Sequence, residues 1–188
     1  MARPATITVA DTIAKSFLLA VATRGDRPAI REKKFGIWQS TSWREWPRKS
    51  KEIAYALDDV GFRPGDVASV MANATPEWVY ADMGILCAGG VSSGIYPTDA
   101  PSQVAYLIND SRTRVIFVED EEQLDKVLLC RDRCPTLERI VVFDMEGLSG
   151  FSDPMVMSLD EFMALGRNAM MGREAAWEEM IASRGPDD

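Results

Sequence analysis

Apolar residues recur every three to four positions near the start of the chain, which predicts a helix capped by Asp11 and running to about Thr23. Its apolar positions are Ile13, Phe17, Leu18 and Val21. Gly25 is expected to end this helix, because glycine readily adopts the left-handed conformation that closes many helices. The helix opens a helix–hairpin–helix segment that we place at residues 11–60.

Two short runs of strand-forming residues follow the first helix. Residues 28–32 and 37–41 are joined across 33–36, and this pattern predicts a hairpin. Ser42 and Glu45 then have the spacing of a capping box ahead of a second helix. That helix has an apolar stripe at Trp46, Ile53, Leu57 and Val60. Its basic residues, Arg44, Arg48, Lys49 and Lys51, are expected on a face exposed to solvent.

Short apolar strands alternate with helices over residues 61–144. Glycine and proline at 61–66 mark a turn from helix to strand. Strands are expected near 67–71, 91–96, 115–118 and 139–143, and helices are expected to begin near Pro76, Pro101 and Asp120. Repeated strand–helix–strand units imply a parallel α/β sheet, so this segment is interpreted as a βα-repeat core.

The remaining residues, 145–188, form an acidic tail that is rich in methionine. The tail has nine acidic and three basic residues and seven of the ten methionines. Ser158 and Glu161 form a capping-box pair ahead of one helix, and a second helix is expected around Trp177, with a flexible stretch at 166–172 between them. Methionines at helical spacing usually fill gaps in a core or an interface. Residues 1–188 are therefore expected to form a single partial domain.

The composition narrows the classes of function. The 188 residues are 46% hydrophobic and carry a formal net charge of −8. This acidic balance gives no basic surface for a phosphate backbone, so no nucleic-acid partner is expected. The longest uncharged run, 83–98, is interrupted by glycine and proline and is shorter than the roughly 20 apolar residues that span a bilayer. Without a transmembrane segment or a signal-peptide core, we expect a cytoplasmic protein.

Side chains that commonly carry catalysis are scarce. The chain has no histidine, which removes the commonest general base. Its three cysteines suit neither a disulfide framework nor a zinc site. The glycines of 84–91 have the spacing of a phosphate loop, but Gly90 and Val91 stand where lysine and Ser/Thr are required. We interpret this segment as a buried helix that ends at the glycines, with a strand after it.

Three loops are candidates for ligand contact, because ligands of open α/β sheets bind beyond the carboxyl ends of the strands. They are residues 72–76, 96–101 and 119–120. Each also contains a residue suited to cap the helix that follows: Asn73 or Thr75, Thr98 or Asp99, and Asp120. Both interpretations stay open, and capping is the more frequent use of such residues.

Several ordered sequence blocks resemble the N-terminal part of AMP-forming acyl-CoA synthetases. The blocks are GFRPGDVASV at 61–70, NATPEW at 73–78 and AGGVSSGIYPT at 88–98. Three flanking blocks resemble the long-chain fatty acid branch in particular: GIWQSTSW at 36–43, QVAYLINDS at 103–111 and VEDEEQLDKV at 118–127. The fold that this resemblance implies is the parallel-sheet N-terminal subdomain of the acyl-adenylate-forming enzymes.

The resemblance implies a two-step reaction, in which ATP and a fatty acid give an acyl-adenylate and pyrophosphate, and coenzyme A then displaces AMP. The partners of the full-length enzyme are thus fatty acid, ATP and coenzyme A, with magnesium assisting. The family's phosphate loop with its lysine, its adenine- and ribose-binding residues and its catalytic lysine would all lie beyond Asp188. We therefore assign no catalytic, cofactor-binding or metal-binding residue to this chain, and expect it to be inactive by itself.

Because the family's catalytic groups would lie beyond Asp188, two interpretations of the chain are open. The chain is either an N-terminal fragment of a long-chain fatty acid–CoA ligase or a free-standing, non-catalytic α/β module, a truncated paralogue that binds an acyl chain or a protein partner. Both interpretations allow the protein to form a homo-oligomer. In the full-length enzyme, long-chain substrates would allow a peripheral contact with membranes, although no residue pattern in the sequence predicts an anchor.

Overall fold

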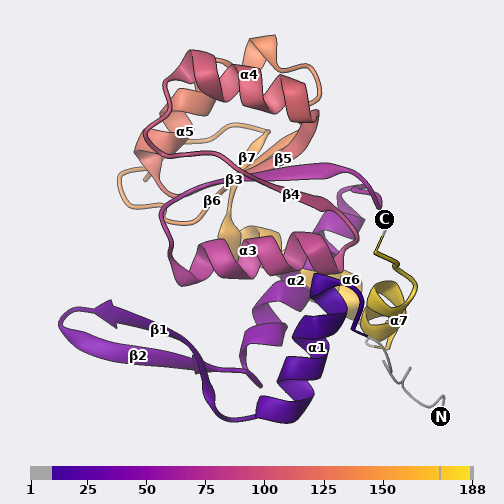
Figure 1. The fold of residues 1–188 in the computed structure, drawn as a ribbon. Helices are drawn as coiled ribbons and strands as arrows, with labels where there is room; N and C mark the ends of the chain where they lie inside the picture. Colours follow the sequence, from indigo (N-terminus) through magenta and orange to yellow (C-terminus); the bar gives the residue numbers. More distant parts are fainter. Residues whose placement is uncertain (1–9, 174, 187–188) are drawn as a thin grey trace.

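A computed structural model describes residues 10–173 and 175–186 (Figure 1). The chain begins with α1 (Ile13–Arg24), β1 (Pro28–Lys34), β2 (Ile37–Ser42) and α2 (Trp46–Asp59). Gly25 ends α1 at a φ of 54° as predicted, but the predicted cap is wrong. Thr12 caps the helix by accepting a hydrogen bond from the backbone N–H of Lys15, whereas Asp11 pairs with the Lys15 ammonium at 2.8 Å.

The predicted hairpin forms with a tighter turn than expected. Lys34 pairs with Ile37, so that Phe35 and Gly36 alone make the turn, and both have positive φ values, 50° and 79°. Ser42 and Glu45 exchange the hydrogen bonds of a capping box just before α2, as predicted. The base of the hairpin is held by aromatic packing of Trp43 on Trp46, with ring centroids 5.3 Å apart.

All five strands of the main sheet are parallel. They are β3 (Val67–Met71), β4 (Val91–Gly94), β5 (Thr113–Val118), β6 (Arg139–Val142) and β7 (Val156–Ser158), in the order β4-β3-β5-β6-β7. Four strands match predicted ones, and β4 ends two residues before the expected position 96. The edge strand β7 was not predicted, since its three residues carry no long apolar run.

The sheet lies between two unequal groups of helices (Figure 1). On one face lie α4 (Pro101–Ser111) and α5 (Glu121–Leu128), followed by η1 (Arg131–Arg133). On the other lie α3 (Pro76–Cys87) and α6 (Leu159–Met170), and beyond them lie α1, α2 and α7 (Ala176–Ala182). Alternate residues of β5 divide between the two cores: Phe117 packs with the larger group and Ile116 with the smaller. The predicted α/β fold with a parallel sheet is confirmed.

The contact between α2 and α6 corrects the expected flexible stretch at 166–172. Gly166 lies inside α6 and is buried against the backbone of α2, where a Cβ atom would come within 1.7 Å of the Glu52 carbonyl oxygen. The Glu52 side chain is 3% exposed and forms ion pairs with Arg48 at 3.1 Å and with Arg167 of α6 at 2.8 Å. The glycine is therefore a close-packing residue of a helix pair.

Candidate functional site

The carboxyl ends of β3, β5 and β6 open onto a cleft of about 340 Å³. Its walls come from the ends of these strands, from the start of α3 and from the hairpin. The lining residues are Glu32, Lys34, Thr75, Glu77, Glu119, Asp120, Phe143 and Asp144. Two of the three predicted loops, 72–76 and 119–120, thus meet at one place. The third loop, 96–101, contributes no residue to the lining of this cleft.

Glu119 ties the first two loops together. Its Oε2 atom accepts hydrogen bonds from the backbone N–H of Asn73 at 2.6 Å and from the Asn73 side-chain amide at 2.8 Å. The backbone continues the sheet ladder past the strand ends, since the Asp144 N–H donates to the Glu119 carbonyl at 2.8 Å. Because the Glu119 carboxylate already accepts two hydrogen bonds, it serves to position the loops.

The capping interpretation holds for two of the loops. Thr75 Oγ1 accepts from the backbone N–H of Trp78 at 3.3 Å, and Asp120 Oδ1 accepts from that of Gln123 at 3.2 Å. For the third loop it is wrong, because Ala100 is the N-cap of α4 and neither Thr98 nor Asp99 caps it. Gln103 instead accepts from the Ala100 N–H at 3.0 Å, since a glutamine at the third helical position can reach back to the cap.

Lys126 holds the 96–101 loop against α5. Its ammonium donates to the Pro97 carbonyl at 2.5 Å and pairs with Glu122 at 2.9 Å. The hydrogen bond from Lys126 keeps the pKa of Glu122 below its ordinary value. The last lysine of the chain therefore has a structural use.

The cleft is strongly acidic. Five carboxylates and one lysine, Lys34, stand among its lining residues. Such a surface repels the phosphates of a nucleotide. Among the residues that the structure describes, no group of three or more acidic, histidine or cysteine side chains is placed to hold a metal ion. The lining therefore does not suit the phosphates of ATP.

Two hairpin residues of the cleft, Glu32 and Lys34, were missed by the sequence analysis. They alternate along β1 and so point to the same side of the hairpin. The strand alternation was visible in the sequence, but nothing local indicated that this side would face the end of the main sheet. Only the placement of the hairpin relative to β3 and β5 brings them there.

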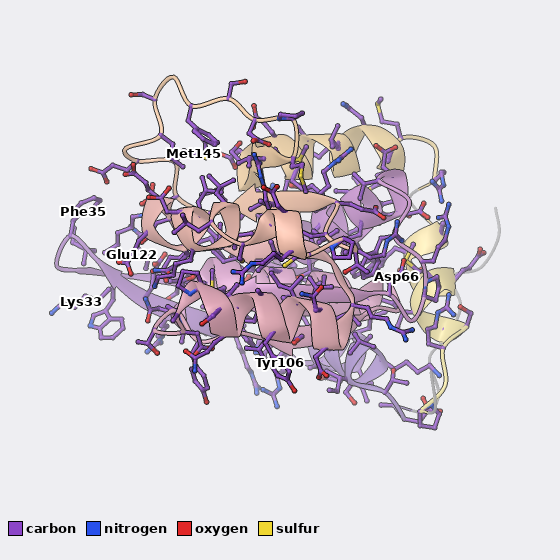
Figure 2. The ribbon with its side chains drawn as sticks, turned by 90° about the horizontal axis from the view of Figure 1, so that it is seen from above. Lys33, Phe35, Asp66, Tyr106, Glu122 and Met145 are labelled. Atoms are coloured by element: carbon purple, nitrogen blue, oxygen red, sulfur yellow. The ribbon has the colours of Figure 1, made fainter. Side chains whose placement is uncertain are left out.

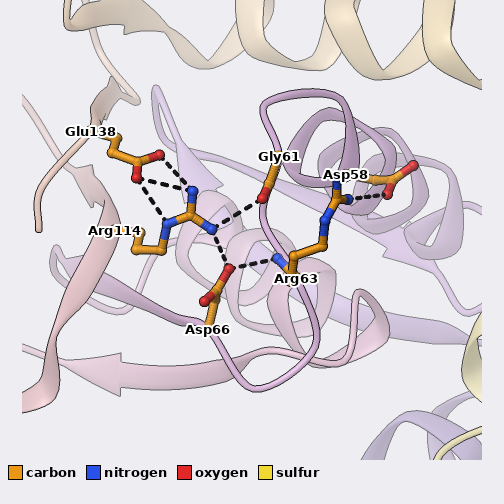
Figure 3. Close-up of polar contacts among 6 residues, drawn as sticks. All are labelled: Asp58, Gly61, Arg63, Asp66, Arg114 and Glu138. Carbon is orange, nitrogen blue, oxygen red and sulfur yellow. Dashed lines mark hydrogen bonds and ion pairs between the residues drawn. The ribbon is translucent and has the colours of Figure 1, made fainter.

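At the opposite end of the sheet, where the strands begin, polar contacts hold the GFRPGDVASV block at 61–70 in place (Figure 3). The Arg114 guanidinium makes a two-pronged contact with Glu138, through Nε at 3.0 Å and Nη2 at 2.7 Å, and also pairs with Asp66. It donates as well to the Gly61 carbonyl at 3.0 Å. The hydrogen bonds from Arg114, first to Glu138 and then to Asp66, raise the pKa of the guanidinium above its ordinary value.

The Asp66 carboxylate also accepts from the Arg63 N–H at 2.6 Å, within the turn that leads into β3. Arg63 in turn reaches Asp58 at the end of α2, at 3.3 Å (Figure 3). The spacing of glycine, proline and aspartate at 61–66 thus has a structural explanation. The turn at 61–66 joins α2 to the amino ends of β3, β5 and β6.

All three cysteines are free and buried. Burial raises the pKa of the Cys87 thiol well above its usual range and that of Cys130 to about 11. Thiols with raised pKa values are poor nucleophiles at neutral pH. The cysteines are therefore packing residues.

The fold of this chain is similar to one part of two larger solved structures, an adenylation domain and a CoA ligase. The adenylation domain of a carboxylate reductase from Mycobacterium chelonae superposes with a TM-score of 0.72 and 20% identity, over 86% of this chain and 30% of that one. The anthranilate CoA ligase AuaEII, in complex with anthranoyl-AMP, superposes with a TM-score of 0.70 and 20% identity, over 87% of this chain and 29% of that one. These likenesses concern the fold.

The sequence places the chain in a family. Residues 17–160 match the AMP-binding enzyme family, and the chain belongs to it. It is 26% identical to the long-chain-fatty-acid–CoA ligase ACSBG1 of Bos taurus and to that of Homo sapiens, over 94% of this chain. The chain spans about a quarter of the length of these curated relatives, 24% in both cases. In the described residues, no helix is long and apolar enough to cross a membrane.

Proposed function

We propose that this chain serves long-chain fatty acid activation as the N-terminal part of an AMP-forming ligase. The reaction joins ATP, a fatty acid and coenzyme A to give acyl-CoA, AMP and pyrophosphate. The observation that carries the proposal is the family match over residues 17–160, together with long-chain ligases among the relatives that align with 94% of the chain.

We also propose that the 188-residue chain does not form an adenylate by itself. Adenylation needs cations and backbone amides that stabilise the charge developing on the phosphates, with a metal ion assisting. The acidic cleft supplies a single cation, Lys34, among five carboxylates. The role of the described residues is to build a folded wall: two helix caps, the Glu119 bridge and the Arg114 network fix the loops at both ends of the sheet.

The test is fatty-acid-dependent exchange of pyrophosphate into ATP. It compares the purified 188-residue chain with the polypeptide recovered by an antibody to this chain from cells that encode it. We expect exchange with a long-chain acid such as oleate in the recovered polypeptide and none in the purified chain. Exchange by the purified chain would refute the proposal that this chain is inactive by itself. A recovered polypeptide without exchange would refute the proposal that the chain is part of a ligase.

The competing function is a free-standing module that binds an acyl chain or a protein partner without catalysis. The exposed apolar side chains of the hairpin favour it, since a surface of this kind commonly meets a partner. A recovered polypeptide of the mass of the 188-residue chain, without exchange activity, would support this second function and exclude the first.

A further inference from the structure

The strand β4 forms an unprotected edge of the main sheet. It pairs with β3 on one side, in regular parallel register, and no strand of the described chain pairs with its other side. Natural edge strands are usually blunted by a charged side chain, a proline or a bulge, because an open edge invites pairing with another strand. Residues 88–98, which contain β4, include no charged side chain, and β4 itself has no proline and no bulge. This edge is typical of a strand that has a neighbour on both sides.

The register identifies the backbone groups that face outward from this edge. The Ile95 N–H donates to the Val70 carbonyl of β3 at 3.0 Å. Neighbouring residues of a strand turn their N–H and C=O groups to opposite sides, so those of Ser92 and Gly94 point away from β3. They form the row of donors and acceptors with which a further parallel strand pairs.

The end of the described chain lies beside the start of β4. Arg184, which follows α7, packs on Gly89, since a Cβ atom on that glycine would lie 2.9 Å from Arg184 Nε. Gly185 and Pro186 line a cavity of about 270 Å³ together with Gly89 and Gly90, the two residues directly before β4. In Figure 1 the yellow segment after α7 runs toward the end of α3, where β4 begins. An extended chain that continues from Pro186 is therefore positioned to run alongside β4.

The chain also returns to the end of the sheet from which the strands start. Figure 2 shows Asp66, the residue directly before β3, at the same end of the molecule as the yellow helix α7. Glu122, which follows the carboxyl end of β5, lies at the opposite end in the same view. A strand that begins next to Pro186 thus runs in the same direction as β4 and is parallel to it.

The helices before this point lie on the face of the sheet that such a connection requires. In the unit β3–α3–β4 the chain moves from β3 to β4 across the face that carries α3. The helices α6 and α7, which follow β7, pack on that same face. A strand beyond β4 lies in the same direction along the sheet order, so its connection from β7 has the same hand as β3–α3–β4. Connections between parallel strands share one hand in nearly all proteins, and this one obeys the rule.

We infer that the free edge of β4 is the docking site of the segment that follows residue 188, which adds a sixth strand to the sheet, parallel to β4. The inference rests on the proposed function, because the longer polypeptide of a ligase supplies that segment. The chain spans 24% of the length of two ligase relatives, which leaves ample sequence for further strands. Strands of parallel sheets are covered on both faces, so we expect a mostly apolar run of about five residues at this place.

Hydrogen exchange of single backbone amides tests the inference. The purified 188-residue chain is compared with the polypeptide expressed from the complete coding sequence. The Ser92 and Gly94 amides are expected to exchange rapidly in the purified chain and at least about a hundredfold more slowly in the longer polypeptide, where they bond to the added strand. The Ile95 amide bonds to β3 in both proteins and is the internal control, expected to be protected in both.

A proline at position 92 removes an outward donor and blocks the approach of a neighbouring strand. Ser92→Pro is expected to restore rapid exchange of the Gly94 amide in the longer polypeptide. The 188-residue chain loses no hydrogen bond by this change, so its far-ultraviolet circular dichroism is expected to match that of the wild type. Ser152→Pro, the same substitution at an exposed loop residue before β7, is the matched control and is expected to leave Gly94 protected. Equal effects of the two prolines on Gly94 would contradict the assignment.

The outcomes separate this inference from the proposed function. Rapid exchange of Ser92 and Gly94 in a longer polypeptide that exchanges pyrophosphate into ATP would overturn the docked strand and leave the ligase standing. Slow exchange in a longer polypeptide without that activity would support the strand and refute the ligase alone. Protection already present in the purified chain would assign the edge to a second copy or to another segment of the 188 residues, and would overturn the inference. A coding sequence that stops after Asp188 would overturn both.

Discussion

Replacing Gly166 with alanine tests the closest contact in the structure. An alanine Cβ at this position would lie 1.7 Å from the Glu52 carbonyl oxygen, half of the 3.4 Å at which ordinary contact begins. It would also lie 3.0 Å from the backbone nitrogen of Ala56. Because these atoms belong to a helix backbone, no change of rotamer can relieve the clash. The two helices must separate, and the ion pair of Glu52 with Arg167 across the same interface is then strained as well.

The expected magnitude is a balance of two effects. Overpacking of this kind costs about 3 kcal/mol at the upper end of its usual range. Alanine is the better helix former and returns about 1 kcal/mol. The net prediction is a loss of about 2 kcal/mol of unfolding free energy, which for a chain of this size lowers the urea midpoint by roughly 1 M.

The assay is urea unfolding followed by circular dichroism and tryptophan fluorescence. Asn168→Ala is the matched control, since it lies two residues away on the exposed side of the same helix. It gains helix propensity without a clash and is expected to change stability by less than about 0.5 kcal/mol. A Gly166→Ala protein as stable as the wild type would refute the close packing of α2 on α6.

Three further changes probe other parts of the structure. Arg114→Met is expected to lower unfolding free energy by about 1–3 kcal/mol in urea melts, because it leaves Asp66 and Glu138 without their shared partner; an unchanged melt would contradict this role. The hydrogen bond from Arg131 holds the pKa of Asp153 below its ordinary 3.8, so this carboxylate stabilises the fold above that pH and the contribution is lost as the pH falls through the lowered value. Asp153→Asn is therefore expected to be less stable than the wild type near pH 6, with the difference shrinking below about pH 3.8; a constant difference would contradict the pairing. Ellman's reagent at about pH 8 is expected to leave the native protein unlabelled and to react after unfolding with all three thiols, those of Cys87, Cys130 and Cys134.

Periodicity and cap residues predicted most of the fold, since these signals are local. Thr75 and Asp120 cap the helices that their positions indicated, and β3 lies at 67–71 as expected. The errors arise where a contact between segments distant in the sequence determines the local structure. Gly166 looks like a flexible joint in the sequence, and only the approach of α2 makes it a packing residue.

The edge strand β7 shows the same limit. Its residues Val156 to Ser158 are extended because β6 provides hydrogen-bond partners, and the local sequence gives no strong strand signal. The part of the cleft formed by the loops after β3 and β5 could be predicted, because a parallel sheet brings the carboxyl ends of its strands to one edge. The hairpin wall of the cleft, Glu32 and Lys34, depends on how the hairpin packs beside the sheet, which no spacing in the sequence encodes.

The proposal that this chain is the N-terminal part of a ligase is tested most directly by the coding sequence that follows the Asp188 codon in the source DNA. We predict that the reading frame continues into a Ser/Thr- and glycine-rich loop that contains a lysine, the phosphate-binding group that the resemblance to acyl-CoA synthetases implies. A natural stop codon at that position would contradict the proposal and leave a non-catalytic α/β module of the AMP-binding enzyme family.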